Sequence, residues 1–316
     1  MSKFDTYQDV TDAILAQLEA GTKPWQKEWQ GAPFTMPRRV TGEHYRGINV
    51  LLLWISAQAN GFAGGQWMTF NQAKKLGGKV RKGSKGTRIV FFKQIDVKDR
   101  DASSDDETKR IPMLRGYTVF NTDQIDDLPD AYRTPELVPV AGIERDRTAE
   151  AALRSCGAQI EERGGAAFYT PATDTVTMPD FERFTSSGGY LATLAHELCH
   201  WTGHKSRLDR FGKNTTPAYA FEELVAELGA AFIGSRLGIL GDHIDNHSAY
   251  LASWLKALKD DKRAIFRAAS LAQAAADLVL AKADTAAAEE LEVMPKAVVA
   301  DQPAAPASPA EQLALI

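Results

Sequence analysis

The stretch YLATLAHELCH, from Tyr190 to His200, decides what can be predicted about the fold of this chain. Its apolar residues recur at helical spacing and predict an amphipathic helix. His196 and His200 are four residues apart, so both imidazoles lie on one helix face and can reach one ion. Glu197 lies about 100° further round the helix, where a carboxylate can contact metal-bound water. The stretch therefore predicts a metal site of the zinc-peptidase type, with Glu197 as general base.

A site of this type needs a third protein ligand and an open fourth position. His204 continues the four-residue spacing, but it reaches the same ion only if the chain bends sharply. An extended histidine motif would place its third histidine at position 206, which is Ser206. The next predicted helix offers Glu223 and Glu227 on one face, with Glu222 as a weaker alternative. We expect Glu223 to bind the metal and Glu227 to orient a histidine ring. The expected ion is Zn²⁺, with another divalent transition metal as the alternative.

Length and composition are those of a soluble chain of two domains. The chain has 316 residues, of which 44% are hydrophobic and 25% charged. We see no apolar run of the ~20 residues that span a bilayer and no apolar signal segment, so we expect a cytoplasmic protein without membrane contact. The only two cysteines, Cys156 and Cys199, exclude a disulfide framework and a cysteine-based zinc finger.

The first 98 residues differ from the rest in charge. They hold 15 Lys and Arg against 7 Asp and Glu, whereas the remainder holds 22 against 34. Basic side chains neutralise phosphates, and aromatic rings stack unpaired bases. The candidate contacts with nucleic acid are the aromatic residues Trp25, Trp29, Tyr45 and Trp67, the polar residues Arg46 and Asn49, and the basic residues Lys79, Arg81, Lys82 and Lys85. In the alternative interpretation, the tryptophans form the core of a small domain and the lysines a solvated hairpin.

Hydrophobic periodicity predicts an α+β fold. The expected helices cover 7–18, 49–59, 70–76, 147–156, 190–200 and 221–237, and the expected strands 88–93, 113–120, 166–169 and 175–178. The charged segment 99–110 is predicted to be a mobile hairpin loop, and the Ala- and Pro-rich residues from about 284 a disordered tail.

Several stretches resemble the ArdC-type antirestriction proteins of conjugative plasmids and the N-terminal parts of plasmid primases. In the first half these are EAGTKPW from Glu19, YRGIN from Tyr45, WMTFNQA from Trp67 and VRKGSKGT from Val80. In the second half they are the segment 196–204, EELVAE from Glu222 and YLASWL from Tyr250. Taken together, the resemblance extends over about residues 4–282.

The resemblance implies a small N-terminal α+β domain that binds single-stranded DNA, followed by a mostly helical, zincin-like metallopeptidase domain. We place the domains at 1–128 and 140–283, with a linker at 129–139 and a tail at 284–316. The family fold agrees with Glu223 as third ligand. It also draws attention to Tyr250, whose hydroxyl could stabilise an oxyanion; the alternative is that Tyr250 belongs to a packed helix stripe.

The resulting hypothesis is an antirestriction protein that protects incoming DNA from host restriction enzymes. Its partners would be single-stranded DNA and subunits of the host restriction enzymes, which a zinc peptidase site would cleave or merely obstruct. The rival hypothesis is a non-enzymatic protein that binds single-stranded DNA and has a structural zinc site.

Overall fold

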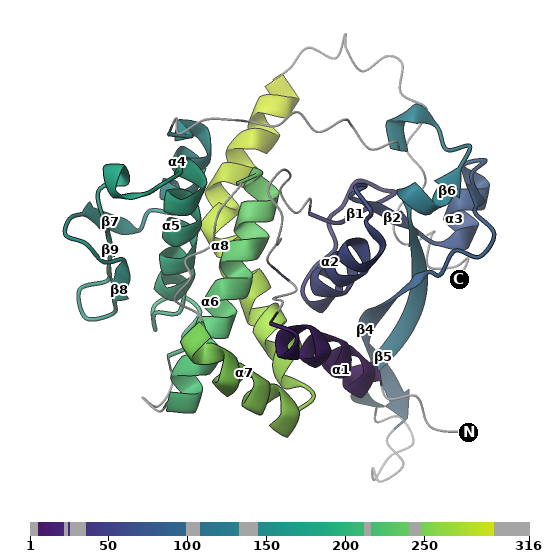
Figure 1. Cartoon of the computed structure of the whole chain (residues 1–316), viewed down its shortest axis with the longest axis horizontal. Coiled ribbons are helices and arrows are strands. Elements are labelled where there is room, and N and C mark those ends of the chain that lie inside the picture. Colours follow the sequence, from purple (N-terminus) through teal and green to yellow (C-terminus); the bar gives the residue numbers. More distant parts are fainter. Residues whose placement is uncertain are drawn as a thin grey trace.

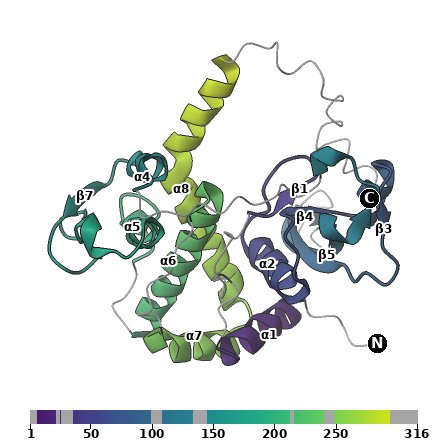
Figure 2. The same cartoon turned by 45° about the horizontal axis from the view of Figure 1, so that its top comes forward.

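A computed structural model of the chain describes residues 6–21, 25, 36–98, 108–132, 145–211, 216–239 and 248–293. An N-terminal part built on a β-sheet lies beside a mostly helical C-terminal part, and the long helix α8 (Ala264–Val293) runs through the centre of the molecule (Figures 1 and 2). The predicted α+β class is confirmed.

The N-terminal part contains a four-stranded sheet with the strand order β1-β2-β5-β4. Its elements are α1 (Thr6–Glu19), β1 (Arg38–Arg39), α2 (Ile48–Asn60), β2 (Gln66–Met68), α3 (Phe70–Lys75), β3 (Lys79–Val80), β4 (Thr87–Lys98), β5 (Thr108–Asn121) and β6 (Ile125–Asp126). Short 3₁₀ turns cover Thr122–Gln124 and Asp130–Tyr132. The strands β3 and β6 form a separate two-stranded sheet.

The hairpin of β4 and β5 is longer than the sequence predicted. The two strands pair antiparallel from Thr87 with Val119 to Lys98 with Thr108, so they extend into the charged segment expected to be a loop. Alternating β-branched and aromatic residues support such extended pairing. The centre of the expected loop, 99–107, lies outside the described residues.

The C-terminal part places three short strands beside a bundle of helices. It consists of α4 (Arg147–Arg154), β7 (Gln159–Glu162), β8 (Phe168–Thr170), β9 (Thr175–Met178), the 3₁₀ turn Phe181–Arg183, α5 (Ser187–Thr202), α6 (Thr216–Leu237), α7 (Ser248–Asp260) and α8. The strand order is β7-β9-β8, which leaves β8 at one edge. The predicted helices and strands are all present, with ends that differ by a few residues.

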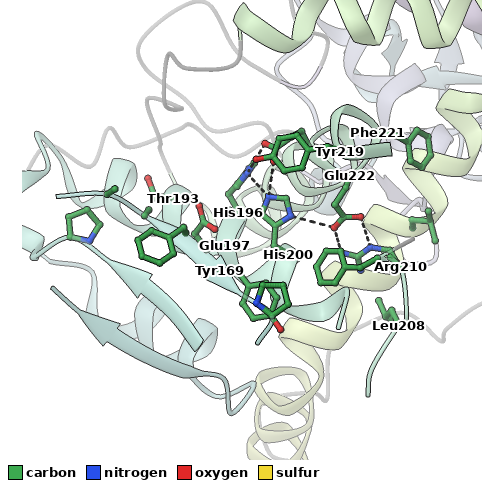
Figure 3. A pocket seen from close by; sticks show the side chains of 18 of the residues that line it. Tyr169, Thr193, His196, Glu197, His200, Leu208, Arg210, Tyr219, Phe221 and Glu222 are labelled. Carbon is green, nitrogen blue, oxygen red and sulfur yellow. Dashed lines mark hydrogen bonds and ion pairs between the residues drawn. The ribbon is translucent and has the colours of Figure 1, made fainter. Parts of the chain in front are cut away.

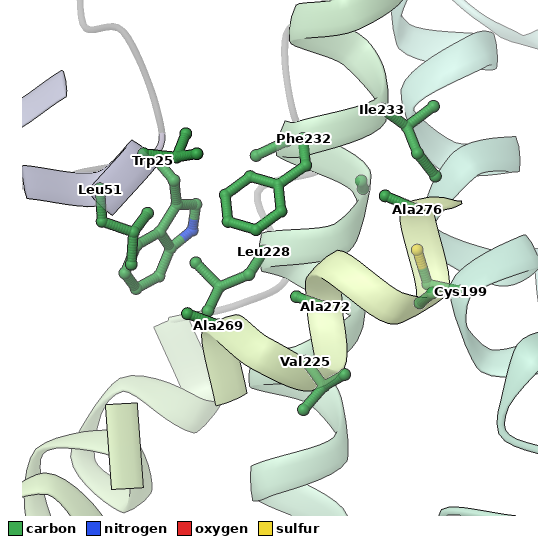
Figure 4. Close-up of a cluster of buried hydrophobic side chains, with 14 of the residues drawn as sticks. Trp25, Leu51, Cys199, Val225, Leu228, Phe232, Ile233, Ala269, Ala272 and Ala276 are labelled. Carbon is green, nitrogen blue, oxygen red and sulfur yellow. The ribbon is translucent and has the colours of Figure 1, made fainter. Parts of the chain in front are cut away.

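Small residues allow α5, α6 and α8 to pack closely. A Cβ atom on Gly229 of α6 would lie 2.5 Å from the sulfur of Cys199 on α5, so this contact requires glycine. On α8, the buried Ala269, Ala272 and Ala276 bring its backbone close to α6 (Figure 4). Burial raises the pKa of the Cys199 thiol to about 12 and makes it unreactive.

The two parts of the molecule share one hydrophobic core. The ring of Trp25 meets that of Trp254 on α7 at a centroid distance of 6.0 Å. The ring of Trp54 on α2 lies 5.8 Å from that of Phe232 on α6. The two parts are therefore packed on each other through aromatic rings.

Helix α8 departs from two sequence predictions. Residues 264–285 are long and apolar enough for a membrane span by length and composition, which the sequence analysis did not detect. This stretch is instead packed as a core helix, with Ala268, Ala272 and Val279 fully buried. The helix also continues to Val293, beyond the tail boundary predicted at residue 284, because Ala and Glu strongly favour helix. Residues 294–316 lie outside the described chain.

Candidate metal centre

Helix α5 presents the two histidines inside the protein. Its N-terminus is capped by Ser186, whose hydroxyl oxygen accepts a hydrogen bond from the amide of Gly189 at 3.0 Å. His196 and Glu197 are each 8% exposed, in a helix otherwise buried on nearly every side. The helix ends at Thr202, and a Cβ atom on the following Gly203 would lie 2.8 Å from the ring of Phe211. Glycine at this position therefore lets the chain fold back towards the histidines.

Three potential ligands converge between α5 and α6. The Nε2 atoms of His196 and His200 lie 3.1 Å apart. The carboxylate of Glu223 faces both of them, with Oε2 at 3.6 Å from His196 Nε2 and Oε1 at 3.4 Å from His200 Nε2. One ligand atom from each of the three residues lies within 4.8 Å of the other two. This spacing leaves room for one ion between them.

The opposite nitrogen of each ring faces a second carboxylate. Nδ1 of His196 lies 3.6 Å from Oε2 of Glu227. Nδ1 of His200 lies 3.4 Å from Oε1 of Glu222. Carboxylates in this position fix the ring and the tautomer of a metal-bound histidine. The sequence anticipated this arrangement for Glu227, whereas it treated Glu222 only as a weaker ligand candidate.

Arg210 holds Glu222 in place and was missed by the sequence analysis. Its guanidinium donates two hydrogen bonds to the Glu222 carboxylate, at 3.1 and 2.7 Å. It also donates to the Thr202 hydroxyl at 2.7 Å and to the carbonyl of Cys199 at 2.6 Å. Arg210 thereby connects the end of α5 to the start of α6 (Figure 3). No motif indicates it, because its partners are distant in sequence.

The electrostatics of the site favour a cation. Burial alone would lower the pKa of His196, but its contacts with Glu223 and Glu227 raise it to about 10. The pKa of His200 is raised as well, since Glu222 and Glu223 outweigh its burial. Conversely, burial opposes ionisation of Glu223, yet the two histidines hold its pKa far below the usual value. A divalent ion between the rings would meet the same negative charge, so these residues fit a metal.

His204, the other histidine considered, lies elsewhere. Its Nδ1 is 2.8 Å from the hydroxyl of Ser206, and it is not part of the ligand cluster formed by the described residues. The bend after α5 therefore does not bring it to the two histidines. Tyr250 lies in α7, but its side chain is outside the described part of the structure, so its predicted role stays a prediction.

A cavity of about 1360 Å³ opens onto these side chains. Glu197 and Thr193 line it beside His196 and His200 (Figure 3). Three further lining residues, missed by the sequence analysis, are the exposed aromatics Phe168, Phe211 and Tyr219. Tyr219 stands four residues before Glu223, on the same helix face, and this spacing could have revealed it.

The aromatic residues proposed to stack DNA bases are buried. Trp25 and Trp67 are each 1% exposed, and Tyr45 is 4% exposed. A ring at these positions offers no free face to a base, so their burial favours the alternative interpretation of core residues. Trp29 lies outside the described residues.

Two other candidates for DNA contact, Asn49 and Arg46, are engaged in contacts within the protein. The Asn49 side chain exchanges hydrogen bonds with the backbone of Val90, at 2.8 and 2.9 Å, along the edge of β4. Arg46 forms an ion pair with Asp277 of α8. Although the Arg46 side chain is 62% exposed, it is therefore engaged in the contact between the two parts.

The predicted basic residues are exposed and belong to two groups. Lys79 pairs with Asp127 at 3.0 Å, and Arg81 lies 3.4 Å from Asp126. Lys82 and Lys85 have no such carboxylate within the described part of the chain. Since ion pairs reduce the net positive charge that a phosphate meets, the second pair is the better candidate.

Comparisons with known proteins assign each half of the chain to a known domain family. Residues 147–271 match a family model for zincin-like metallopeptidases, and residues 4–120 match the N-terminal domain of anti-restriction factor ArdC. Together with the histidine-glutamate cluster, these matches define a zincin-like domain joined to an ArdC-type N-terminal domain. Such a domain implies a divalent metal.

Relatives of similar length narrow the class to one family. The crystal structure of antirestriction protein ArdC from plasmid R388, without metal, is 48% identical and covers 89% of this chain and 99% of its own, with a TM-score of 0.79. Its Mn(II)-bound structure has a TM-score of 0.75 at the same identity, with 89% and 98% covered. The protein y4eC of Sinorhizobium fredii is 40% identical over 91% of this chain and 95% of its own length. The chain belongs to the ArdC family of antirestriction proteins.

One further relative is much longer. DNA primase TraC of Escherichia coli is 40% identical over 297 residues, which are 87% of this chain and 20% of the primase. The chain thus corresponds to about a fifth of TraC.

Proposed function

We propose that this protein binds single-stranded DNA through its N-terminal part, holds one zinc ion in its C-terminal part, and thereby protects incoming DNA from restriction in the host cytoplasm. Zinc would be bound by His196, His200 and Glu223. The site would act as a peptidase on subunits of the host restriction enzymes, or merely obstruct them. Membership in the antirestriction family and the convergence of the three ligand atoms support this proposal.

The metal centre carries the enzymatic half of the proposal. Two imidazoles and one carboxylate, with space for a fourth ligand, are the donor set of zinc hydrolases. Zinc in such a site supplies Lewis acidity and lowers the pKa of a bound water. Glu197, in the cavity beside the histidines, would serve as the general base. The carboxylates of Glu222 and Glu227 would keep the two rings oriented.

The test measures protection against restriction in recipient cells for the wild type and the variant Glu197→Gln. We expect the variant to retain metal and single-stranded DNA binding but to lose protection, because removal of a general base costs roughly 10²–10⁴-fold in rate. Glu182→Gln, which changes an exposed glutamate of the 3₁₀ turn at 181–183, is the matched control and should protect like the wild type.

Two outcomes would contradict parts of this proposal. If Glu197→Gln protects as well as the wild type, the site is not catalytic in protection, and the protein acts as a non-enzymatic DNA-binding protein. If the wild-type protein binds no single-stranded DNA, the role of the N-terminal part is wrong, whatever the metal centre does.

A further inference from the structure

The exposed aromatic residues lie in two regions. Among the described residues, the large apolar side chains at the surface are Phe70, Phe91, Phe168, Phe211 and Tyr219. The last three line the cavity at the metal centre. Phe70 and Phe91 belong instead to the basic N-terminal part, where the buried tryptophans offer no face to a ligand.

One side of the β4–β5 hairpin faces outward at the pair of Arg88 and Thr118, although Val90, two residues further along the same side, is buried at 7% exposed. Side chains alternate between the two faces of a strand. On β5, Val119 is 1% exposed and packs in the core, whereas Thr118 is exposed on the other side. Arg88 of β4 pairs with Thr118, so its exposed side chain is on the outer side as well. Helix α3 contacts β5 and meets this side through Phe70 and Phe120.

Phe70 stands at the border of this outer side. The capping box of Thr69 and Gln72 fixes the start of α3, with the Thr69 amide donating to Gln72 Oε1 at 2.8 Å. Phe70 is therefore held at the first helical position, where it is 55% exposed. Lys74, four residues on, lies on the same face of the short helix.

Contacts connect Phe70 to the hairpin. Its ring lies 6.5 Å from the ring of Phe120, which points to the same side of β5 as Thr118. A Cβ atom on Gly86 would lie 3.0 Å from the Phe120 ring, so the backbone passes directly over it. We name the resulting surface the outer face: it comprises Phe70, Lys74, Arg88, Thr118 and Phe120.

Glycine also keeps the far end of the outer face flat. A Cβ atom on Gly116 would collide with the guanidinium of Arg88, which lies across this bare backbone. The planar group is thus held against the sheet, in a side chain that is exposed overall. Guanidinium planes and aromatic rings both stack on unpaired bases, and guanidinium groups also bind phosphates.

The charge of the outer face matches a phosphate backbone. Lys74 is exposed, and within the residues that the structure describes it has no carboxylate at ion-pair distance. Lys79, by contrast, pairs with Asp127 at 3.0 Å. The outer face therefore combines the exposed ring of Phe70 with the positively charged side chains of Lys74 and Arg88.

We propose that single-stranded DNA lies across the outer face, with a base stacked on Phe70 and phosphates bound by Lys74 and Arg88. This inference rests on the proposed DNA binding and assigns it to a surface other than the tryptophans indicated by the sequence. A single strand fits because an exposed ring can stack only on an unpaired base, whereas the bases of a duplex are stacked on each other.

The test measures binding of a fluorescent oligothymidylate by the full chain at fixed salt. We expect Phe70→Ala to weaken binding roughly tenfold, as for the loss of one stacked base. Arg88→Ala should reduce the slope of log affinity against log salt by about one. The matched control is Phe91→Ala, which changes an exposed phenylalanine three residues after Arg88, on the other side of β4. It should bind like the wild type.

Thermal unfolding of each variant distinguishes a loss of DNA affinity from a loss of the folded structure. If the wild type binds while Phe70→Ala and Arg88→Ala bind equally well, the outer face is not the DNA site, although the proposed function stands. If the wild type binds duplex as tightly as single strand, the stacking part of the inference is overturned. If the wild type binds no oligonucleotide, the DNA-binding part of the proposed function fails, and this inference fails with it.

Discussion

The two halves of this molecule differ in how well their candidate sites could be found from sequence. In the C-terminal half, His196 and His200 were assigned by spacing, and they meet Glu223 in the structure. In the N-terminal half, Trp25 and Trp67 were selected as exposed stacking residues, and they are buried. A helical spacing of four residues is local geometry, whereas the exposure of a ring depends on everything packed around it.

The contrast between Trp25 and Phe70 shows the same point within one domain. Both are aromatic residues close to basic segments. Trp25 packs against Trp254 of α7, which is distant in sequence, while Phe70 is 55% exposed on the outer face. Residue type and local composition do not distinguish the two rings. The residues packed around each ring in the tertiary structure decide whether it is buried or exposed.

The largest effect on stability is expected from Trp25→Ala. Removal of a buried tryptophan leaves a cavity and lowers the free energy of unfolding by about 3–5 kcal/mol. Chemical denaturation measures this loss, and Phe70→Ala is the control, because an exposed substitution changes stability by only about 0.5 kcal/mol. A stable Trp25→Ala protein that has lost DNA binding would restore the sequence-based interpretation and remove the contrast.

Glu223→Ala tests the ligand assignment in the other half. Four ligands share about 10–16 kcal/mol in a structural zinc site, so the loss of one ligand should weaken metal binding roughly a hundredfold or more. Competition with a chelating dye measures the affinity. His204→Ala is the control and should bind metal normally, since His204 contacts Ser206. The reverse result, with His204 essential and Glu223 dispensable, would refute the assignment.

A smaller effect is expected from the carboxylates behind the two histidines. Glu222→Gln and Glu227→Gln should each weaken metal binding about 10–100-fold, because the histidine rings lose their orienting partners. The same dye competition measures it, with unfolding of the metal-saturated protein recorded beside it. Unchanged affinity in both variants would mean that the backbone alone positions the rings.

The smallest effect concerns acid stability of the C-terminal half. The hydrogen bond from Arg145 holds the pKa of Glu150 below its usual value of 4.5. Burial raises this pKa, and a second hydrogen bond, from Arg154, lowers it further. A carboxyl with a lowered folded-state pKa stabilises the protein above that usual value and loses this contribution as the pH falls. We expect the melting temperature of the wild type to fall more between pH 6 and roughly pH 3 than that of Glu150→Gln. Parallel melting curves would contradict this.

Much of the fold could be predicted because its elements carry local signals. The helical residues 190–200 and the strand residues 88–93 and 113–120 follow from periodicity, whereas the continuation of the hairpin to Lys98 and Thr108 does not. The extension of α8 to Val293 could not be read from composition, since the same Ala- and Glu-rich sequence is typical of disordered tails. At the site, Arg210 had no signal, because it contacts Glu222, Thr202 and Cys199 through a fold that the sequence does not display.

The sequence by itself determined the candidate ligand pair His196 and His200, the general-base candidate beside it, and the division into a basic and an acidic half. These depend on residue type and on distances along the chain, which a helix converts directly into distances in space. The tertiary structure alone decided that Arg210 supports the cluster and that Phe70 rather than Trp25 is exposed, and it places Glu223, which the sequence already favoured over His204, beside the two histidines. Each of these depends on which distant segments pack together, because burial and convergence are properties of the assembled core.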